Sequence, residues 1–287
     1  MFAERVGSVK MHAKVSDSVA ADLVQRLDRR VRDAMPGFQG RFIKSTGDGL
    51  LLGFEEAPAA VRCAGEIHRL CDELARGGKQ DFLVRIAAHT GEVLHGDGDI
   101  HGNTVNLAAR ILSVAVAGET SVTAETWAGL GAGERQGFVP HGPEMFKGFA
   151  RFCFLHKKPN PDPLMDPTLR PGSLGDEETV RHLTDAMPKH ARYALVLEHP
   201  QLNKTVLLSE GETHVFGRAP ECGTVIADRM LSGTHAAFAV VEGILWCFDL
   251  ESSNGVTYRG RRVRRRTPVE KNSMVELPAG SIQVKLP

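Results

Sequence analysis

Apolar and polar positions follow two different patterns along this chain, one in each half. Between residues 1 and 156, short apolar runs alternate with segments in which apolar residues recur every three or four positions, as on one face of a helix. Helices are expected from Ser16 and Asp17 to Pro36, over Ala57–Arg76 and over Thr104–Val114. Strands are expected at 1–6, in a 41–54 hairpin, at 82–94 and at 146–155. The resulting βαββαβ order predicts an α+β, ferredoxin-like domain with two helices on one face of an antiparallel sheet.

From Tyr193 onward the helical period disappears. Short β-rich runs follow one another at intervals near ten residues, separated by turn residues. This pattern predicts an all-β sandwich. Between the two patterns lies 157–191, in which five prolines between residues 157 and 178 interrupt any regular structure, with a short helix expected at Glu177–Met187. We therefore expect a first domain at 1–156, a linker at 157–191 and a second domain at 192–287.

The composition is that of a soluble globular protein. The 287 residues suit about two domains, with 42% hydrophobic and 24% charged residues. No run of about 18 apolar residues occurs, and Glu4 and Arg5 stand where a signal peptide would be apolar. The five cysteines are scattered without a CxxC pair, and the formal net charge is zero. We expect a cytoplasmic protein with reduced thiols, and neither membrane nor nucleic acid as a partner.

A glycine-flanked turn is the first candidate for chemistry. The segment KSTGDGLLLGF at 44–54 reads as strand, turn and strand, with Asp48 in the turn. By itself it would be read as a surface hairpin with a solvated carboxylate. In a βαββαβ sheet, however, Glu4 on the first strand can face Asp48. Two carboxylates so placed can hold two Mg²⁺ or Mn²⁺ ions for an in-line displacement at phosphorus.

A second candidate is the helix that begins after GDGDIHG. Asn106 and Arg110 lie four residues apart on it and so share one face. An amide and a guanidinium in this arrangement suit a ribose oxygen and a phosphate. Together with FAERVGS, KSTGDG, DIHGNTVNLAAR and the late FKGF segment, these features make residues 2–156 resemble a class III nucleotidyl cyclase domain.

The resemblance implies roles for particular residues and a homodimer. Glu4 and Asp48 would bind two metal ions, Asn106 would orient the ribose, and Arg110 would stabilise charge in the transition state. Members of the family build their sites between two head-to-tail protomers. One protomer supplies the metal ligands, and its partner supplies the purine-reading residues, the asparagine and the arginine.

The resemblance assigns purine reading to Lys44 and Asp99, and the chemistry of these side chains favours adenine. Lysine only donates and carboxylate only accepts hydrogen bonds, which complements N1 and the N6 amine of adenine. Guanine would leave at least one of them mispaired, at about 1–3 kcal/mol. The implied reaction converts ATP to cyclic AMP and pyrophosphate, and guanylate cyclase activity is disfavoured.

The chain departs from the family at Glu4, where the family carries Asp. The extra methylene moves the carboxylate by about an ångström, and a displacement of that size can cost about 10²-fold in rate. The alternative hypothesis is therefore a pseudo-cyclase of weak or no activity, acting as a phospho-dependent scaffold.

Three spaced motifs in the second domain resemble the forkhead-associated (FHA) signature over 193–287. They are Gly217-Arg218, SGTH at 232–235 and DLESSNG at 249–255. The resemblance implies that Arg218 and Ser232 contact the phosphate of a phosphothreonine, and that Ser253 and Asn254 contact the phosphate or the peptide backbone. His235 would brace the loops, and Gly217 and Gly255 would be structural.

The implied partner is a phosphothreonine-containing protein, or this chain itself, modified by an upstream Ser/Thr kinase. The basic run RGRRVRRR at 259–266 allows several interpretations. It can attract acidic phosphopeptides or nucleic acid, but a solvated hairpin with Val263 pointing inward is the favoured one.

Overall fold

The computed structural model describes residues 1–6, 17–47, 49–78, 82–96, 98–159, 192–278 and 280–285. Ser16, Asp48, most of the expected linker and its Glu177–Met187 helix lie outside these residues. Within them, contacts divide the chain into two compact units, one holding 1–142 and 154–159, the other 143–153 and 192–285. No helix in the described part of the chain has the length and apolar character to cross a membrane.

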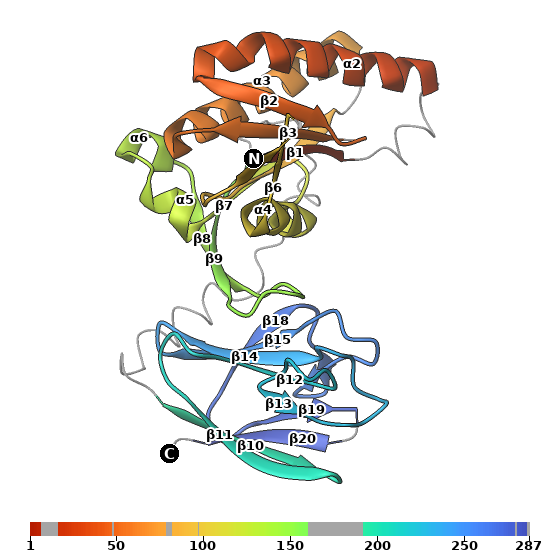
Figure 1. Ribbon diagram of the computed structural model, residues 1–287, viewed down its shortest axis with the longest axis vertical. Helices are drawn as coiled ribbons and strands as arrows, with labels where there is room; N and C mark the ends of the chain where they lie inside the picture. The colour runs from red at the N-terminus through yellow and green to blue at the C-terminus, as the bar shows by residue number, and fades with distance from the viewer. Residues whose placement is uncertain are drawn as a thin grey trace. The chain divides into compact units, whose positions relative to one another are not determined.

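The first unit is built on one seven-stranded sheet (Figure 1), in the order β2-β3-β1-β4-β7-β9-β8. Its strands are β1 (Phe2–Val6), β2 (Gly40–Ser45), β3 (Gly49–Phe54), β4 (Leu83–Ala88), β7 (Glu119–Thr123), β8 (Val139–Glu144) and β9 (Cys153–Pro159). Strand β1 runs antiparallel to both β3 and β4, so it lies in the interior of the sheet. A separate short hairpin joins β5 (Leu94–Gly96) to β6 (Asp99–His101).

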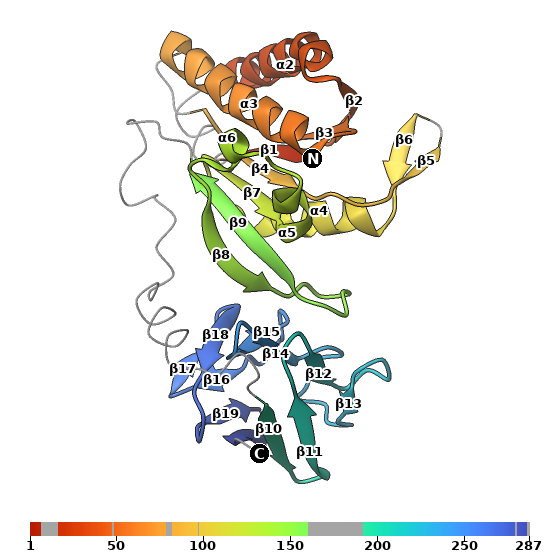
Figure 2. The ribbon, with the colours of Figure 1, turned by 90° about the vertical axis from the view of Figure 1, so that its left-hand side faces the viewer.

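Helices cover both faces of this sheet (Figures 1 and 2). They are α2 (Asp17–Ala34), the 3-10 helix η1 (Met35–Phe38), α3 (Ala57–Gly78), α4 (Asn103–Val114), α5 (Ala124–Ala128) and α6 (Ala132–Arg135). One core combines Leu27 of α2 and Ile67 of α3 with Ala3 of β1. Because neighbouring side chains on a strand point to opposite faces, Glu4 lies on the face away from that core.

The expected βαββαβ order is confirmed, but two expected strands were wrong in extent. The strand expected at 82–94 ends at Ala88, because the chain then turns where Gly91 lies so close to Thr104 that an added Cβ would stand 2.6 Å from its Oγ1. The strand expected at 146–155 begins only at Cys153. Gly148 has a φ of +88°, and Phe149 N–H donates to Phe146 O at 3.0 Å, so FKGF forms a turn.

The second unit is the expected β-sandwich. A six-stranded sheet has the order β11-β10-β20-β19-β16-β17, and a five-stranded sheet the order β13-β12-β14-β15-β18. The strands are β10 (Tyr193–His199), β11 (Leu202–Leu208), β12 (Thr213–Gly217), β13 (Thr224–Val225), β14 (Ala236–Val241), β15 (Ile244–Asp249), β16 (Thr257–Tyr258), β17 (Arg261–Arg262), β18 (Arg266–Val269), β19 (Met274–Leu277) and β20 (Gly280–Lys285). Alternate residues of the two sheets, such as Leu195 and Phe238, form a fully buried core.

Candidate functional site

Glu4 lies on β1, between strands β3 and β4. Its Cα partner on one side is Gly49 and on the other Arg85 of β4. Arg85 Nη2 donates a hydrogen bond of 2.7 Å to Glu4 Oε1, and the two side chains are 26% and 33% exposed. Sequence reasoning missed Arg85, although a lone charge inside the apolar run 82–88 was a usable signal. The arrangement puts a guanidinium beside the candidate metal ligand.

The turn between β2 and β3 lies against the strand that carries Glu4. Gly47 has a φ of +71°, and Thr46 N–H donates to Gly49 O at 2.7 Å. A Cβ added at Gly49 would stand 2.8 Å from Ala3 O, so only glycine fits this approach. Asp48 lies outside the described residues, but both of its neighbours are described, and Gly49 is the Cα partner of Glu4. A hard divalent cation takes oxygen ligands, so the Glu4 carboxylate fits one.

Arg5, which stands next to Glu4 in the sequence, serves the other face of the sheet. It lines a hollow of about 110 Å³ together with residues of α2 that include Leu27 and Asp28. This hollow is on the side of the α2–α3 core, away from Glu4. The charge at position 5 therefore does not compete for the Glu4 carboxylate.

Lys44 and Asp99 are brought together from segments 55 residues apart. Lys44 Nζ forms an ion pair with Asp99 Oδ2, and Ile100 N–H donates to Asp99 Oδ1 at 2.8 Å. The hydrogen bond from Lys44, then that from Ile100, lowers the pKa of Asp99. The lysine remains 46% exposed and the carboxylate 23% exposed, so both can reach a ligand.

Asn106 and Arg110 both lie on α4 and are exposed. The helix buries Ala108, Ile111 and Leu112 instead, which turns the surface bearing residues 106 and 110 outward. No described contact joins either side chain to Glu4. Within one chain the structure thus forms two groupings, Lys44 with Asp99 and Glu4 with Arg85, and leaves Asn106 and Arg110 open. Among the residues that the structure describes, no cluster of three or more His, Cys, Asp or Glu forms another metal site.

In the second unit, backbone and side-chain hydrogen bonds join three loops. Arg218 N–H donates to Ser232 O at 3.0 Å, and Ser253 N–H donates to Ser232 Oγ at 3.0 Å. Asn254 Nδ2 donates to Met230 O at 2.8 Å. The side chains of Arg218, Ser253 and Asn254 are exposed. The predicted phosphopeptide residues therefore share one surface.

Buried residues brace these loops. His235 is fully buried, accepts a hydrogen bond from Ser232 N–H at Nδ1 (3.0 Å) and has Nε2 3.1 Å from Gly255 O. Burial lowers the pKa of His235. Ser252, which sequence reasoning missed, accepts a hydrogen bond from Gly255 N–H at 3.0 Å. A Cβ at Gly217 would stand 2.1 Å from a backbone oxygen, which accounts for the glycine there.

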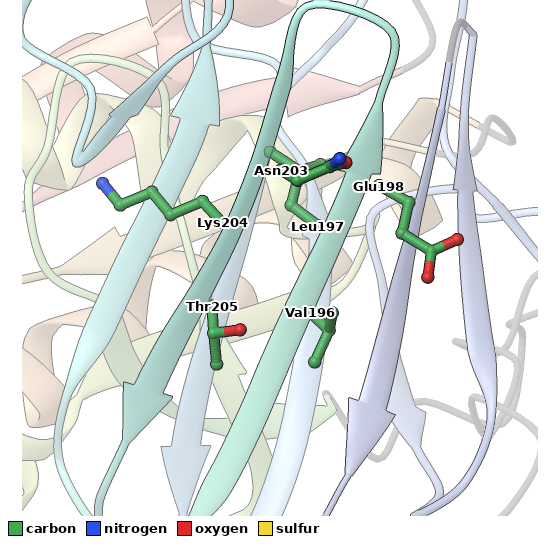
Figure 3. Close-up of a pocket in the computed structure, with 6 residues that line it drawn as sticks. All are labelled: Val196, Leu197, Glu198, Asn203, Lys204 and Thr205. Carbon is green, nitrogen blue, oxygen red and sulfur yellow. The ribbon is translucent and has the colours of Figure 1, made fainter.

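A hollow of about 440 Å³ lies along the β10–β11 hairpin (Figure 3). It is lined by Val196, Leu197, Glu198, Asn203, Lys204 and Thr205. None of the site residues expected from the sequence lines it. The candidate chemistry therefore lies at the strand ends and loops described above.

The fold and these residues define a two-part protein, a mixed α/β domain of nucleotide-cyclase type followed by a β-sandwich of FHA type. The family model "Adenylate and Guanylate cyclase catalytic domain" matches residues 1–156, and the "FHA domain" model matches 214–278. The chain belongs to the adenylate and guanylate cyclase family and carries a C-terminal FHA domain.

Individual relatives match the first domain at modest identity. The chain is 29% identical to "Putative adenylate cyclase 3" of Rhizobium meliloti over 125 residues, 43% of this chain and 21% of that protein. It is 32% identical to an adenylate cyclase of Glutamicibacter nicotianae over 130 residues, 44% of this chain and 31% of that protein. The chain thus spans less than a third of the length of either relative.

Solved structures resemble each domain separately. An adenylate/guanylate cyclase/hydrolase from Silicibacter pomeroyi is 29% identical, with a TM-score of 0.47, covering 56% of this chain and 94% of that one. The FHA domain of the CT664 protein from Chlamydia trachomatis is 24% identical, with a TM-score of 0.32, covering 33% of this chain and 97% of that one.

Proposed function

We propose that the chain is a class III adenylate cyclase that converts ATP to cyclic AMP and pyrophosphate at a homodimer interface. The ion pair between Lys44 and Asp99 carries this proposal. It joins one obligate donor and one obligate acceptor at an accessible surface, the pattern that adenine complements. The adenylate cyclases among the relatives point the same way.

No atom is transferred to the protein in this reaction. The ribose 3′-oxygen attacks the α-phosphorus, the bond to the β-phosphate oxygen breaks, pyrophosphate leaves, and the 3′-hydroxyl proton is released. Asn106 would orient the ribose and Arg110 would stabilise the charge that develops on the phosphate oxygens. Arg85, next to Glu4, adds a guanidinium on the side where the triphosphate would be held.

Glu4 and Asp48 would hold Mg²⁺ or Mn²⁺, two ions per site. When bound, the ions would neutralise phosphate charge and stabilise the negative charge on the attacking and leaving oxygens. Glu4 would contribute an oxygen that is now partly engaged by Arg85, so the carboxylate is held in position before any ion arrives.

The dimer explains why one chain leaves its groups apart. Lys44, Asp99, Asn106 and Arg110 of one protomer would face the carboxylates of the other, giving two equivalent sites. Mixing inactive Glu4→Ala and Asn106→Ala protomers tests this arrangement. Half of the dimers formed at random would be mixed, and each would hold one intact site, so activity would return to about a quarter of the wild-type level. Recovery below detection in mixed dimers would refute it.

The enzymatic proposal is tested with purified chain, ATP or GTP, and Mg²⁺ or Mn²⁺. Cyclic AMP is the expected product, and Asp48→Ala should remove it, whereas Glu56→Gln, which changes an exposed carboxylate before α3, should not. Full activity in Asp48→Ala would exclude the metal assignment.

A catalytically weak pseudo-cyclase is the second candidate, because Glu4 stands where the family carries Asp, and a metal ion would have to share its Oε1 with the hydrogen bond from Arg85. Glu4→Asp distinguishes the two, because it restores the carboxylate that the family carries. Absence of cyclic nucleotide from both the wild type and the Glu4→Asp variant would exclude the enzyme and leave the scaffold as the remaining candidate.

We also propose that the FHA domain binds phosphothreonine, in a partner protein or in this chain, after modification by a Ser/Thr kinase. The convergence of Arg218, Ser232 and Ser253 supports this, since a guanidinium and hydroxyls on preformed loops suit a dianion. Binding of a phosphothreonine peptide should be lost on dephosphorylation and in Arg218→Ala. Equal binding of the unphosphorylated peptide would refute the proposal.

A further inference from the structure

The arginine-rich run that follows the FHA loops is not a uniformly paired surface. Of its six arginines, Arg259 forms an ion pair with Glu270. Arg261, Arg262, Arg264 and Arg265 are exposed. In the described part of the chain, no carboxylate lies within ion-pairing distance of these four guanidinium groups. Their positive charge is therefore free to act on a ligand.

The run is fastened to the loop that carries two candidate phosphopeptide residues. We call 262–265 the arginine segment and 249–256 the asparagine loop. Arg265 O accepts a hydrogen bond from Asp249 N–H at 2.8 Å, and Val263 N–H donates to Val256 O at 2.8 Å. These backbone contacts hold the two segments side by side at both ends.

Arg262, the residue before Val263, lies directly on the asparagine loop. Its Nη2 is 3.4 Å from Ser252 O, and a Cβ added at Gly255 would stand 2.6 Å from its Nε. Ser253 and Asn254, the candidate peptide-binding residues, lie between Ser252 and Gly255. The guanidinium groups thus adjoin the surface on which a phosphopeptide would lie.

Counted together, the two segments carry a net formal charge of about +1, with the three positive charges gathered on the arginine segment. The asparagine loop contributes Asp249 and Glu251, and Asp249 Oδ1 is already occupied by Ser252 N–H at 3.0 Å. The arginine segment contributes three positive charges, Arg262, Arg264 and Arg265. Arginine guanidinium groups form bidentate ion pairs with carboxylates and with phosphates.

We infer that the arginine segment selects phosphothreonine peptides whose neighbouring residues are acidic. The inference rests on the proposed phosphothreonine binding and adds to it the chemical class of the sequence around the phosphate. A peptide is favoured over nucleic acid for two reasons. Three of the four exposed arginines of the run lie in the arginine segment beside the asparagine loop, and the whole chain has a formal net charge of zero.

The test uses the full chain and fluorescein-labelled peptides in an anisotropy assay at 50 and 300 mM NaCl. Three phosphothreonine peptides differ only in their flanks, which are acidic before the phosphothreonine, acidic after it, or neutral. Exposed ion pairs are each worth about two- to fivefold in affinity. The wild type should therefore prefer one acidic peptide by about tenfold at low salt, and the preference should shrink at high salt.

The double variant Arg264→Gln/Arg265→Gln should reduce that preference to about twofold and leave the neutral peptide's affinity unchanged. The matched control Lys271→Gln/Lys285→Gln removes two exposed charges near the Asn272 N–H to Val284 O contact, at the opposite end of β18 and β15 from the asparagine loop. This control should keep the full preference. Retention of the preference in the arginine variant, or an equal loss for neutral and acidic peptides, would overturn the inference.

Two further outcomes distinguish a failure of this inference from a failure of phosphothreonine binding itself. If the neutral phosphopeptide binds through Arg218 but acidic flanks bring no gain, phosphothreonine binding stands and the inference fails. If no phosphopeptide binds at all, the proposed function fails and the inference fails with it. A labelled 20-nucleotide RNA serves as a probe for the nucleic-acid alternative. RNA binding that depends on Arg264 and Arg265, without selectivity for acidic peptides, would also overturn it.

Discussion

Replacing His235 with alanine should disconnect the FHA loops. The imidazole is fully buried and lies between two backbone groups of opposite character, Ser232 N–H and Gly255 C=O. The first can only donate and the second only accept, so the ring must be neutral with its proton on Nε2. Alanine would leave the buried Gly255 C=O and the partly buried Ser232 N–H without this partner.

The expected loss of stability follows from those two groups. Each buried polar group left unsatisfied costs about 1–3 kcal/mol, so His235→Ala should cost about 2–6 kcal/mol. A domain of this size has about 5–15 kcal/mol of stability in total, so the change is a large fraction of it. Phosphopeptide affinity should fall as well, because Ser232 is one of the two ends of this bridge.

Unfolding by urea, followed by Trp246 fluorescence, measures the effect. The chain has two tryptophans, so all variants would carry Trp127→Phe to make the signal specific to the second unit. His214→Ala is the control, since the side-chain hydrogen bond of His214 in the described part of the chain goes to the Thr224 side chain at 2.8 Å and not to residues 230–235 or 249–255. It should cost less stability and leave phosphopeptide binding intact. A free energy of unfolding for His235→Ala within about 0.5 kcal/mol of the wild-type value would refute the reasoning.

The buried His235 also makes the free energy of unfolding depend on pH. Burial lowers the folded-state pKa of His235 below its ordinary value of 6.5, whereas the unfolded chain takes up the proton near 6.5. The contribution is therefore complete above pH 6.5 and is lost as the pH falls toward the folded-state pKa. Between pH 7.5 and 5.5, the free energy of unfolding should fall less in His235→Ala than in the wild type. An unchanged slope would contradict the assigned protonation state.

Two further predictions concern the first unit. Lys157 Nζ lies 3.0 Å from Glu119 Oε1, and both residues are almost fully buried. Lys157→Met would leave the Glu119 charge buried and unpaired, so it should lower the free energy of unfolding, measured by thermal unfolding, by about 3–5 kcal/mol. Adding Glu119→Gln should recover most of that loss. His68, bonded to Thr120 Oγ1 at 3.0 Å, has its pKa lowered by burial from 6.5 to about 4. Its contribution is complete above pH 6.5 and declines as the pH falls toward 4, by about 2 kcal/mol at pH 5, and His68→Gln should remove that decline in urea unfolding.

Local periodicity was sufficient to predict most elements. The spacing of apolar residues in 57–76 matches α3, and the glycine-flanked turn at 47–49 separates β2 from β3, because helix faces and tight turns depend on neighbours within a few residues. The errors at 82–94 and 146–155 arose where apolar content continued through a turn. Gly91 packs against Thr104, and Gly148 adopts a positive φ, and neither feature can be read from hydrophobicity alone.

The sequence by itself determined the residue types and the spacings that carry chemistry, namely the glycine-flanked turn, the Asn106–Arg110 repeat and the FHA motifs. Tertiary structure decided which of these groups meet. Lys44 reaches Asp99 across 55 residues, and Arg85 reaches Glu4 across 81. Arg262 comes to lie on Ser252 because the chain crosses between sheets there. Strand register and sheet order set these pairings, and they depend on how distant segments bury their apolar faces together.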